Sequence, residues 1–462
     1  MGNILISLGS VIREKGLFKE IEPLSEKTFF LVEKKHNYLY SELIESQKIY
    51  FERNLLKKKE SKFNANINLN LIYKITDEIL KDQNSYFILS RKKLNYYEYS
   101  PMRLKDIIVN LINKSINIIL DKKLEYFIIH NTPHSENWFL FRTAELMGKK
   151  IFIIRESIFP GYSRFHFGLK NQKIINSGGD KSKFKKKLFD KFFKEKNKKR
   201  YIYPKLQNDR KSLYSNNYSG LIPEIRFFFK EDSFNFKRTI KAKLAVIKTA
   251  IYKQDSLSFY QKKVSVYKKL DLKSYSPYAV FFLHYQPERT SIPEANSFSF
   301  QYKTILFLKK LLPKAMNLLI KEHPDAYRNK FSPRFKSIEA YKNIISIPGI
   351  FFCDMDLDPF SIIDDATLVA TLTGNVGIES ICRGKKIIYF GNPIYKDYPH
   401  AINGSDNLTK SKLNKFIENN KLIGKDSIEH YLKNYFSNSY KNNFENFSTN
   451  LLNFLINNID LY

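Results

Sequence analysis

The stretch TLVATLTGNVGIESICRGKKIIYFG, residues 367–391, has the pattern of a strand, a tight turn, a helix and a second strand. Apolar side chains dominate residues 367–372 and 386–390, as in strands that are buried on both faces of a parallel sheet. Between them, residues 376–382 have helical spacing, and a glycine-containing turn at 373–375 precedes this helix. The stretch therefore predicts an α/β domain with a small-residue turn at the carboxyl end of a strand.

Alternating strands and helices continue on both sides of this stretch and occur again in the first third of the chain. In the second half, apolar runs predict strands at 279–283, 317–320, 344–347 and 350–353, with a helix over 302–312. In the first third, strands are predicted over 124–129 and 150–154, with helical patterns over 104–120 and 135–147. This alternation predicts two doubly wound α/β domains, each with a parallel sheet.

The composition limits the functional classes. The chain has 462 residues, 43% of them hydrophobic, which excludes global disorder. Its 78 Lys and Arg against 46 Asp and Glu give a net charge of +32, which favours nucleic acid, acidic lipid or phosphorylated substrates. An A/T-biased coding sequence would also supply many lysines, so part of this charge has a compositional explanation. Two cysteines exclude a disulfide framework and a four-cysteine zinc site, and they fit a reducing cytosol.

No membrane anchor is expected from the sequence. No apolar run approaches the roughly 18 residues of a transmembrane helix, and the N-terminus lacks the pattern of a secretory signal.

The segment from Lys181 to Arg200 is a dense basic run with Phe and Leu interleaved. It predicts either an amphipathic helix on anionic lipid or on a phosphate-rich acceptor, or an ordinary solvated helix with one apolar side.

Polar clusters follow three predicted strands of the second half. They are the segment from His284 to Thr290, the KEHP segment at 321–324 and the turn at 373–375. Histidine and arginine side chains hydrogen-bond phosphates, and a small-residue turn lets backbone amides approach a ligand closely. Glu379, one helical turn further, can accept hydrogen bonds from ribose hydroxyls. Each cluster taken alone also has a purely structural explanation, but three at the strand ends of one domain indicate a binding site.

A fourth cluster lies in the first domain. His130, His134 and Glu136 follow the strand at 124–129, and Glu156 follows the strand at 150–154. These four are candidate acid–base or acceptor-orienting groups, and we expect His134, Glu136 and Glu156 to be catalytic. Either Glu136 or Glu156 would act as base or nucleophile, and the choice between them stays open. Ser135 and Glu136 are equally suited to capping the helix that follows.

Three motifs resemble a known family. QPERT at 286–290, KEHP at 321–324 and TGNVGIESICRGKKIIYFG at 373–391 are similar to the bacterial capsule polysaccharide biosynthesis family, which includes Kdo transferases. The resemblance covers residues 278–395, and NTPH at 131–134 resembles the first domain of such proteins less specifically. It implies a GT-B fold, in which two Rossmann-like domains face each other across a cleft.

The patterns along the chain predict a domain organisation, and the resemblance adds the role of each domain. Residues 1–200 would form the N-terminal acceptor-binding and catalytic domain, and 201–275 a basic helical connector. Residues 276–430 would form the Rossmann-like domain that binds the sugar nucleotide, and 431–462 a C-terminal helical segment.

Donor-site residues follow from the same resemblance, with His323 on the donor phosphate and the turn on phosphate and ribose. The residues expected to bind the donor are Gln286, Pro287, Arg289, Glu322, His323, Pro324, Thr373, Gly374, Asn375, Gly377 and Glu379. The donor would be CMP- or UDP-linked, with no cofactor and no metal ion. Asp354 and Asp356 form a literal DxD pattern, but their position favours a polar turn.

These implications predict a cytoplasmic glycosyltransferase of capsule or lipopolysaccharide biosynthesis, acting on a glycan or lipid-linked acceptor. The donor sugar could be Kdo from CMP-Kdo. The basic segment from Lys181 to Arg200 would contact the anionic inner face of the membrane, and nucleic acid is not expected as a partner. A sugar-nucleotide epimerase or hydrolase of GT-B-like fold is the alternative enzyme. A nucleic-acid-binding protein and a non-catalytic assembly protein are the alternatives of other classes.

Overall fold

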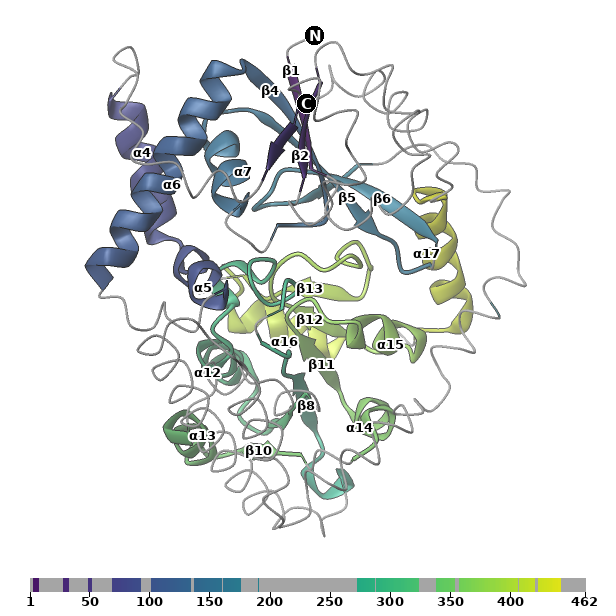
Figure 1. Ribbon diagram of the computed structural model, residues 1–462. Helices are drawn as coiled ribbons and strands as arrows, with labels where there is room; N and C mark the ends of the chain where they lie inside the picture. The colour runs from purple at the N-terminus through teal and green to yellow at the C-terminus, as the bar shows by residue number, and fades with distance from the viewer. Residues whose placement is uncertain are drawn as a thin grey trace, which may run out of the picture. The chain divides into compact units, whose positions relative to one another are not determined.

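The chain forms two compact units (Figure 1). Unit 1 comprises Met1–Lys92, Tyr96–Phe189 and Glu429–Tyr462, and unit 2 comprises Lys93–Asn95 and Asp190–Ile428. The computed structural model describes residues 3–7, 28–32, 49–51, 69–92, 101–133, 137–159, 161–175, 190, 272–286, 288–323, 338–353, 357–405, 407–419 and 423–441.

Two predicted segments fall largely outside these ranges. The helical connector predicted over 201–275 is described only at its end, where Leu272–Tyr275 forms a short 3-10 helix. Of the basic segment from Lys181 to Arg200, only Asp190 is described. The membrane contact of that segment therefore stays a prediction.

Unit 2 is built on a six-stranded sheet in the order β10-β9-β8-β11-β12-β13. The strands are β8 (Tyr278–Phe282), β9 (Asn317–Lys321), β10 (Ile350–Phe352), β11 (Leu368–Thr371), β12 (Ile387–Tyr389) and β13 (Ala401–Asn403). Every neighbouring pair is parallel. In chain order this is 3-2-1-4-5-6, the doubly wound arrangement, and its direction reverses between β8 and β11.

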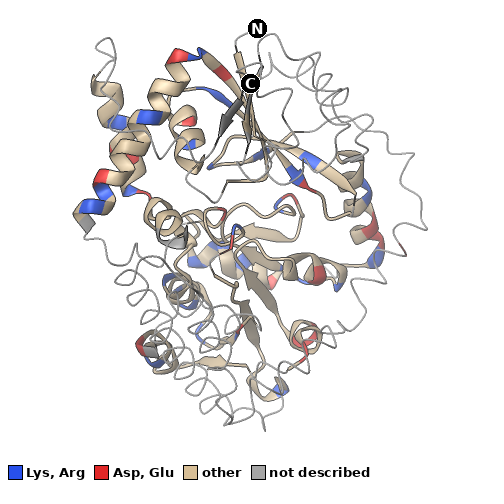
Figure 2. Cartoon of the chain, viewed as in Figure 1, with Lys and Arg blue, Asp and Glu red and all other residues tan. Residues whose placement is uncertain are grey.

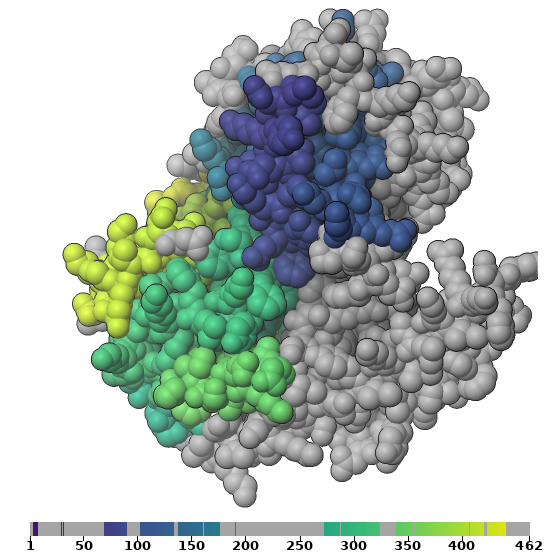
Figure 3. Space-filling model, turned by 90° about the vertical axis from the view of Figure 1, so that its left-hand side faces the viewer, coloured from purple at the N-terminus to yellow at the C-terminus, as the bar shows by residue number. Residues whose placement is uncertain are grey.

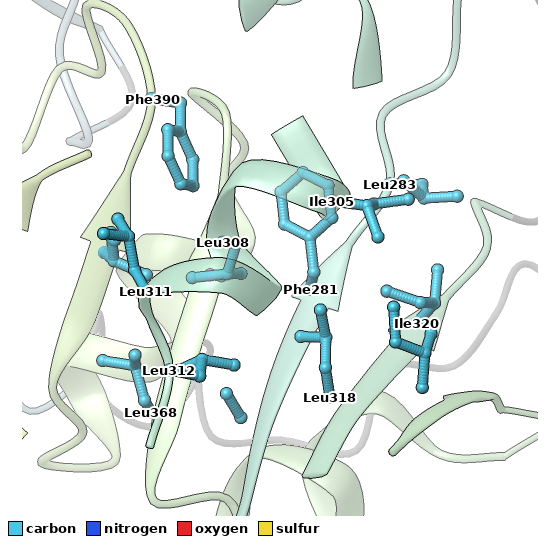
Figure 4. Packing of buried hydrophobic residues seen from close by; sticks show 14 of the residues in the cluster. Phe281, Leu283, Ile305, Leu308, Leu311, Leu312, Leu318, Ile320, Leu368 and Phe390 are labelled. Atoms are coloured by element: carbon cyan, nitrogen blue, oxygen red, sulfur yellow. The ribbon is translucent and has the colours of Figure 1, made fainter. Parts of the chain in front are cut away.

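Side chains of β8 alternate between two apolar cores, one on each face of the sheet. Ala279 and Phe281 belong to the core beneath α12 (Gln301–Leu311), α13 (Ile338–Ile345) and α16 (Lys410–Glu418). Tyr278 and Val280 belong to the core beneath α14 (Pro359–Asp365). Figure 4 shows the first of these cores, with Phe281 among side chains of α12 and β9. Burial on both faces explains why the strand sequences are almost continuously apolar.

One predicted strand is wrong. Residues 344–347 were expected to be extended, but Ile344 and Ile345 end helix α13. Tyr341 and Ile344, three residues apart, are both buried against the sheet, which is the spacing of a helix face. Four apolar residues in a row are too few to distinguish a strand from a helix end.

Unit 1 is built on a second sheet, in the order β14-β6-β5-β4-β1-β2-β3, with β7 paired to β6. The strands are β1 (Asn3–Ser7), β2 (Thr28–Val32), β3 (Ile49–Phe51), β4 (Leu124–His130), β5 (Lys150–Glu156), β6 (Tyr162–Phe167), β7 (Lys173–Ile174) and β14 (Tyr440–Lys441). From β3 to β5 the pairs are parallel and repeat the 3-2-1-4-5 order of unit 2. The predicted α/β class with two Rossmann-like sheets is therefore confirmed.

Helices α4 (Leu69–Lys81), α5 (Gln83–Lys92), α6 (Pro101–Asp121) and α7 (Asn137–Leu146) accompany this sheet. Figure 3 shows α4, α5 and α6 in purple and blue on the surface of unit 1, and α12 and α13 in green on that of unit 2. None of the helices in the described ranges combines the length and the apolar character needed to span a bilayer. Figure 2 shows Lys and Arg on helices of both units, so the positive charge is shared among several elements.

The chain returns to unit 1 through α17 (Lys425–Ser437). Its Phe436 packs against Phe159 and Tyr162, and the guanidinium of Arg164 lies 3.9 Å from the centre of the Tyr435 ring. The segment then continues as β14, antiparallel to β6. The sequence predicted only helix in this region, because a two-residue strand has no recognisable pattern.

Candidate functional site

Three polar motifs of unit 2 follow three neighbouring strands. The segment from His284 to Thr290 follows β8, KEHP begins at the end of β9, and the turn at 373–375 follows β11. Because the strand order is β9-β8-β11 and all three are parallel, their carboxyl ends lie side by side. The reversal of strand order between β8 and β11 is the position where open parallel sheets bind ligands. The expected gathering of these motifs at one edge of the sheet is thus present.

His284 is the residue that links two of the motifs. It is 6% exposed, and its Nε2 accepts a hydrogen bond from the backbone N–H of Thr373 at 3.2 Å. Nε2 also lies 3.2 Å from Oγ1 of Thr371, and Nδ1 lies 3.4 Å from Oγ1 of Thr290. The side chain of Gln301 accepts from the backbone N–H of His284 and donates to its carbonyl oxygen, at 2.6 and 3.0 Å. Ring and backbone of His284 are therefore both held in place.

Burial keeps this imidazole neutral. Desolvation lowers the pKa of His284 to about 3, and the nearby His323 contributes to the same shift. A neutral ring has one nitrogen that accepts and one that donates. Because the backbone N–H of Thr373 can only donate, Nε2 is the acceptor, and the proton lies on Nδ1.

The turn itself is fixed by three further hydrogen bonds. The N–H of Gly374 donates to Oγ1 of Thr371 at 3.3 Å, and the hydroxyl of Tyr395 donates to the Gly374 carbonyl at 2.8 Å. The hydroxyl of Thr373 donates to the carbonyl of Thr290 at 2.6 Å. Each bond joins the turn to a different part of the unit, so its backbone conformation is set by the protein.

Two glycines of the turn region lie close against neighbouring side chains. A Cβ atom at Gly377 would lie 2.1 Å from Cζ of Tyr395, well inside van der Waals contact. A Cβ atom at Gly374 would lie 3.0 Å from Nε2 of His284. From the sequence, the small residues are expected to let a ligand approach the backbone closely. The structure gives Gly377 a different reason, which is room for the buried Tyr395 ring.

The helix that follows the turn, α15 (Val376–Cys382), has only seven residues. Asn375, at the N-cap, is exposed, whereas Glu379 is 3% exposed. The ribose contact assigned to Glu379 stays a prediction.

The KEHP segment positions its histidine through Glu322. This carboxylate is 1% exposed, accepts the backbone N–H of His323 at 2.9 Å and accepts the hydroxyl of Tyr341 at 2.7 Å. The ring of His323 is half-buried and lies 5.9 Å, centre to centre, from the ring of Tyr285. Glu322 therefore shapes the segment from inside, and His323 reaches the surface. Pro324 lies outside the described residues.

The QPERT segment is also held by internal partners. Gln286 is buried, and its Nε2 donates to the carbonyl of Ser299 at 2.7 Å. Nε of Arg289 lies 3.5 Å from Oε1 of Glu294, a carboxylate whose side chain is fully buried. These contacts give Gln286 and Arg289 structural roles, and their predicted contacts with a donor stay predictions. Pro287 lies outside the described residues.

The candidate groups of unit 1 are only partly described. Glu156 ends β5 and is exposed, whereas His134 and Glu136 lie outside the described residues. Behind Glu156, Nη1 of Arg155 donates to Oε1 of Gln172, and Nε2 of Gln172 donates to Oγ1 of Thr132. These bonds tie the end of β5 to the loop after β4. Nothing in this geometry selects between the two candidate carboxylates.

Metal binding was not expected from the sequence. Among the residues that the structure describes, no group of three or more His, Cys, Asp or Glu side chains is arranged to hold an ion. Asp354 and Asp356, the literal DxD pattern, lie outside those residues.

Three side chains that shape the site lie outside every motif found in the sequence. They are Gln301, Tyr341 and Tyr395, which hold His284, Glu322 and the turn, respectively. Each is a single polar residue in a helix or loop, and no local pattern marks it.

Gly377→Ala tests the packing of the turn. The added methyl group must displace the Tyr395 ring, so we expect a loss of about 1–3 kcal/mol in the free energy of unfolding, as for other overpacked sites. Denaturant unfolding of the purified variant measures this loss. In a Tyr395→Ala background the ring is absent, and the same glycine substitution should cost less than about 0.5 kcal/mol, because alanine is the better helix former. Equal costs in the two backgrounds would contradict the assignment.

Comparison with known proteins identifies a matching family model and several solved structures that are distantly similar. A family model described as "Capsule polysaccharide biosynthesis protein" matches residues 169–428. A search of curated proteins gives no significant match. One similar structure is UDP-GlcNAc 2-epimerase of Methanocaldococcus jannaschii with UDP-GlcNAc and UDP, at 11% identity and a TM-score of 0.23, covering 93% of this chain and 98% of that one. Another is KpsC of Thermosulfurimonas dismutans, a β Kdo 2,7 transferase, at 10% identity and a TM-score of 0.30, covering 77% and 97%.

The match to the family model establishes the family of this chain. It spans more than half of the chain and includes all three strand-end motifs of unit 2. The protein belongs to the capsule polysaccharide biosynthesis family.

Proposed function

We propose that the protein is a glycosyltransferase of bacterial surface polysaccharide biosynthesis. It transfers a sugar from a CMP- or UDP-linked donor to a glycan or lipid-linked acceptor of capsule or lipopolysaccharide. The observation that carries this proposal is the meeting of the QPERT, KEHP and turn motifs at neighbouring strand ends of unit 2, in a member of this family. Kdo from CMP-Kdo is the donor sugar that the resemblance favours.

In this proposal the donor phosphate lies over the carboxyl ends of β8, β9 and β11. His323 donates a hydrogen bond to it, and the backbone of the turn at Gly374 and Asn375 lies on its other side. Positioned donors lower the barrier by stabilising the negative charge that develops on the departing nucleotide. The hydrogen bond from His323 N–H to Glu322 supports this role, since it fixes the direction in which the histidine leaves β9. The proposal needs no divalent cation.

A carboxylate of unit 1 completes the reaction. Either Glu136 or Glu156 removes the proton of the acceptor hydroxyl, or attacks the donor sugar as nucleophile. The exposed position of Glu156 at the end of β5 supports its access to substrate. Acceptor-dependent transfer distinguishes this reaction from that of an epimerase or hydrolase, which would convert the sugar nucleotide with no acceptor present.

Nucleotide binding is the first test. CMP or UDP at 100 times its dissociation constant should stabilise the folded protein by about 2.7 kcal/mol and raise its melting temperature, whereas GDP should have little effect. His323→Ala should keep the wild-type melting temperature without ligand, lose most of the nucleotide-induced rise, and abolish sugar transfer. The matched control is His430→Ala, since His430 is exposed on α17 in unit 1.

Two outcomes would count against the proposal. One is a wild-type protein whose melting temperature none of the three nucleotides changes. The other is a His323→Ala variant that responds to nucleotide as the wild type does.

We also propose that the segment from Lys181 to Arg200 brings the enzyme to the inner face of the cytoplasmic membrane. Replacing Lys185, Lys186 and Lys187 by Glu should then release the protein from phosphatidylglycerol vesicles in a sedimentation assay, because each lysine near an anionic surface contributes about 1 kcal/mol. The control makes the same change at three exposed lysines of α16, Lys410, Lys412 and Lys415. Equal partitioning of both variants and the wild type would instead indicate an ordinary solvated helix.

A further inference from the structure

We propose that His284 is a positioning residue of the donor site, which holds the turn in its binding conformation by accepting the Thr373 N–H at Nε2 while Nδ1 carries the proton. This inference rests on the proposed function, since the turn is the place where the donor phosphate would bind. His284 belongs to a polar cluster that the sequence singled out, but it was not among the residues expected to bind the donor. The contacts of its ring with Thr371 and Thr373 indicate the positioning role.

The position of His284 on the sheet allows it to act across two strands. It follows β8, whereas Thr371 and Thr373 belong to the end of β11, the neighbouring strand. Gln301 clamps the backbone of His284 through both of its polar groups. The imidazole is therefore a fixed acceptor, and the turn is aligned against it.

Every polar atom in this contact has a matching partner. The N–H of Thr373 donates to Nε2, so the ring proton is on Nδ1, where it points to Oγ1 of Thr290 at 3.4 Å. The hydroxyl of Thr290 in turn donates to Oε2 of Glu288 at 2.8 Å. The hydroxyl oxygen of Thr371 accepts the N–H of Gly374, which leaves its proton free to point to Nε2 at 3.2 Å. A chain of hydrogen bonds thus runs from the turn to Glu288.

Protonating the ring would break this arrangement. A proton on Nε2 would face the N–H of Thr373, and two donors would then oppose each other in a buried place. Burial and the neighbouring His323 disfavour the charged ring. Glu288, the carboxylate at the end of this series of hydrogen bonds, is joined to His284 through the hydroxyl of Thr290. With both nitrogens engaged, His284 is not available as a general acid or base. Its contribution is to the shape of the turn.

The consequence is a turn that is organised before a ligand arrives. The amides of Thr373 and Gly374 and the carbonyl of Gly374 all have partners inside unit 2. Gly374 and Asn375 nevertheless remain partly or fully exposed, so a ligand can approach the outer side of the turn. A site that needs no rearrangement loses less conformational entropy on binding.

Two substitutions distinguish the loss of the hydrogen-bond acceptor at Nε2 from the loss of the imidazole ring as a whole. In His284→Gln, the side-chain carbonyl reaches about as far as Nε2 and can still accept the Thr373 N–H. In His284→Asn, the amide reaches only about as far as Nδ1, and the Thr373 N–H loses its acceptor. We expect the dissociation constants of CMP and UDP, measured by calorimetry, to rise about tenfold or more in His284→Asn. His284→Gln should stay within about threefold of wild type.

The exposed histidine His430 supplies the control, since His430→Asn should leave both constants unchanged. A His284→Asn variant that binds nucleotide like the wild type would overturn the inference. So would a His284→Gln variant that is no better than His284→Asn.

The tautomer can be measured without any nucleotide. In protein labelled with ¹⁵N-histidine, long-range ¹H–¹⁵N spectra should show one neutral ring protonated at Nδ1 that does not titrate between about pH 5.5 and 8.5. Its signal should vanish in His284→Asn and shift in Thr290→Val, a milder variant that removes the acceptor of the Nδ1 proton together with the hydroxyl that donates to Glu288. A ring protonated at Nε2, or one that titrates in this range, would overturn the inference even if nucleotide binds. Conversely, the expected tautomer in a protein that binds neither CMP nor UDP would contradict the proposed function and leave the role of His284 in the turn standing.

Discussion

The parallel pairing of β9, β8 and β11 is the constraint on which the site depends. It brings together segments that are far apart in the chain, as the hydrogen bond from Thr373 to His284 shows by joining residues 89 positions apart. None of these segments has the required shape by itself, because each is held by a partner from another element. The site therefore forms only when the strands have paired in the sheet. The apolar cores on both faces of the sheet supply the stability that the polar strand ends cannot.

Most of the buried polar side chains near the strand ends serve the shape of the site. The side chains of Glu322, Gln286 and Gln301 form hydrogen bonds with backbone groups or with a tyrosine hydroxyl of the same unit. Burial of such groups without partners would cost several kcal/mol, so their satisfaction is a condition for folding. The motif residues thus form two groups, an inner one that builds the scaffold and an outer one, including His323 and Asn375, that stays accessible.

Much of this architecture could be predicted from the sequence. The strands at 279–283, 317–320 and 367–372 could be predicted because parallel strands buried on both faces are continuous apolar runs. The order of these strands in the sheet, which brings the motifs together, comes from the structure. Residues 344–347 were misassigned because the local pattern does not distinguish a strand from a helix here. The burial of Tyr341 and Ile344 on one side favours the helix. Gly377 also leaves room for the Tyr395 ring, which comes from a later loop and could not be foreseen from the turn sequence, and its contact with a donor stays a prediction. The partners of Glu322 and His284 could not be predicted, because single polar residues carry no periodic signal.

The central claim is that the strand-end motifs of unit 2 hold the nucleotide of the donor. Hydrogen–deuterium exchange of the wild-type protein with and without saturating CMP or UDP tests it directly, because a bound ligand slows exchange where it covers or stiffens the backbone. The account predicts slower exchange in peptides that contain 284–290, 321–324 and 371–379, with peptides of α13 and α16 unchanged. Protection confined to other segments, or no protection with a nucleotide that demonstrably binds, would contradict it.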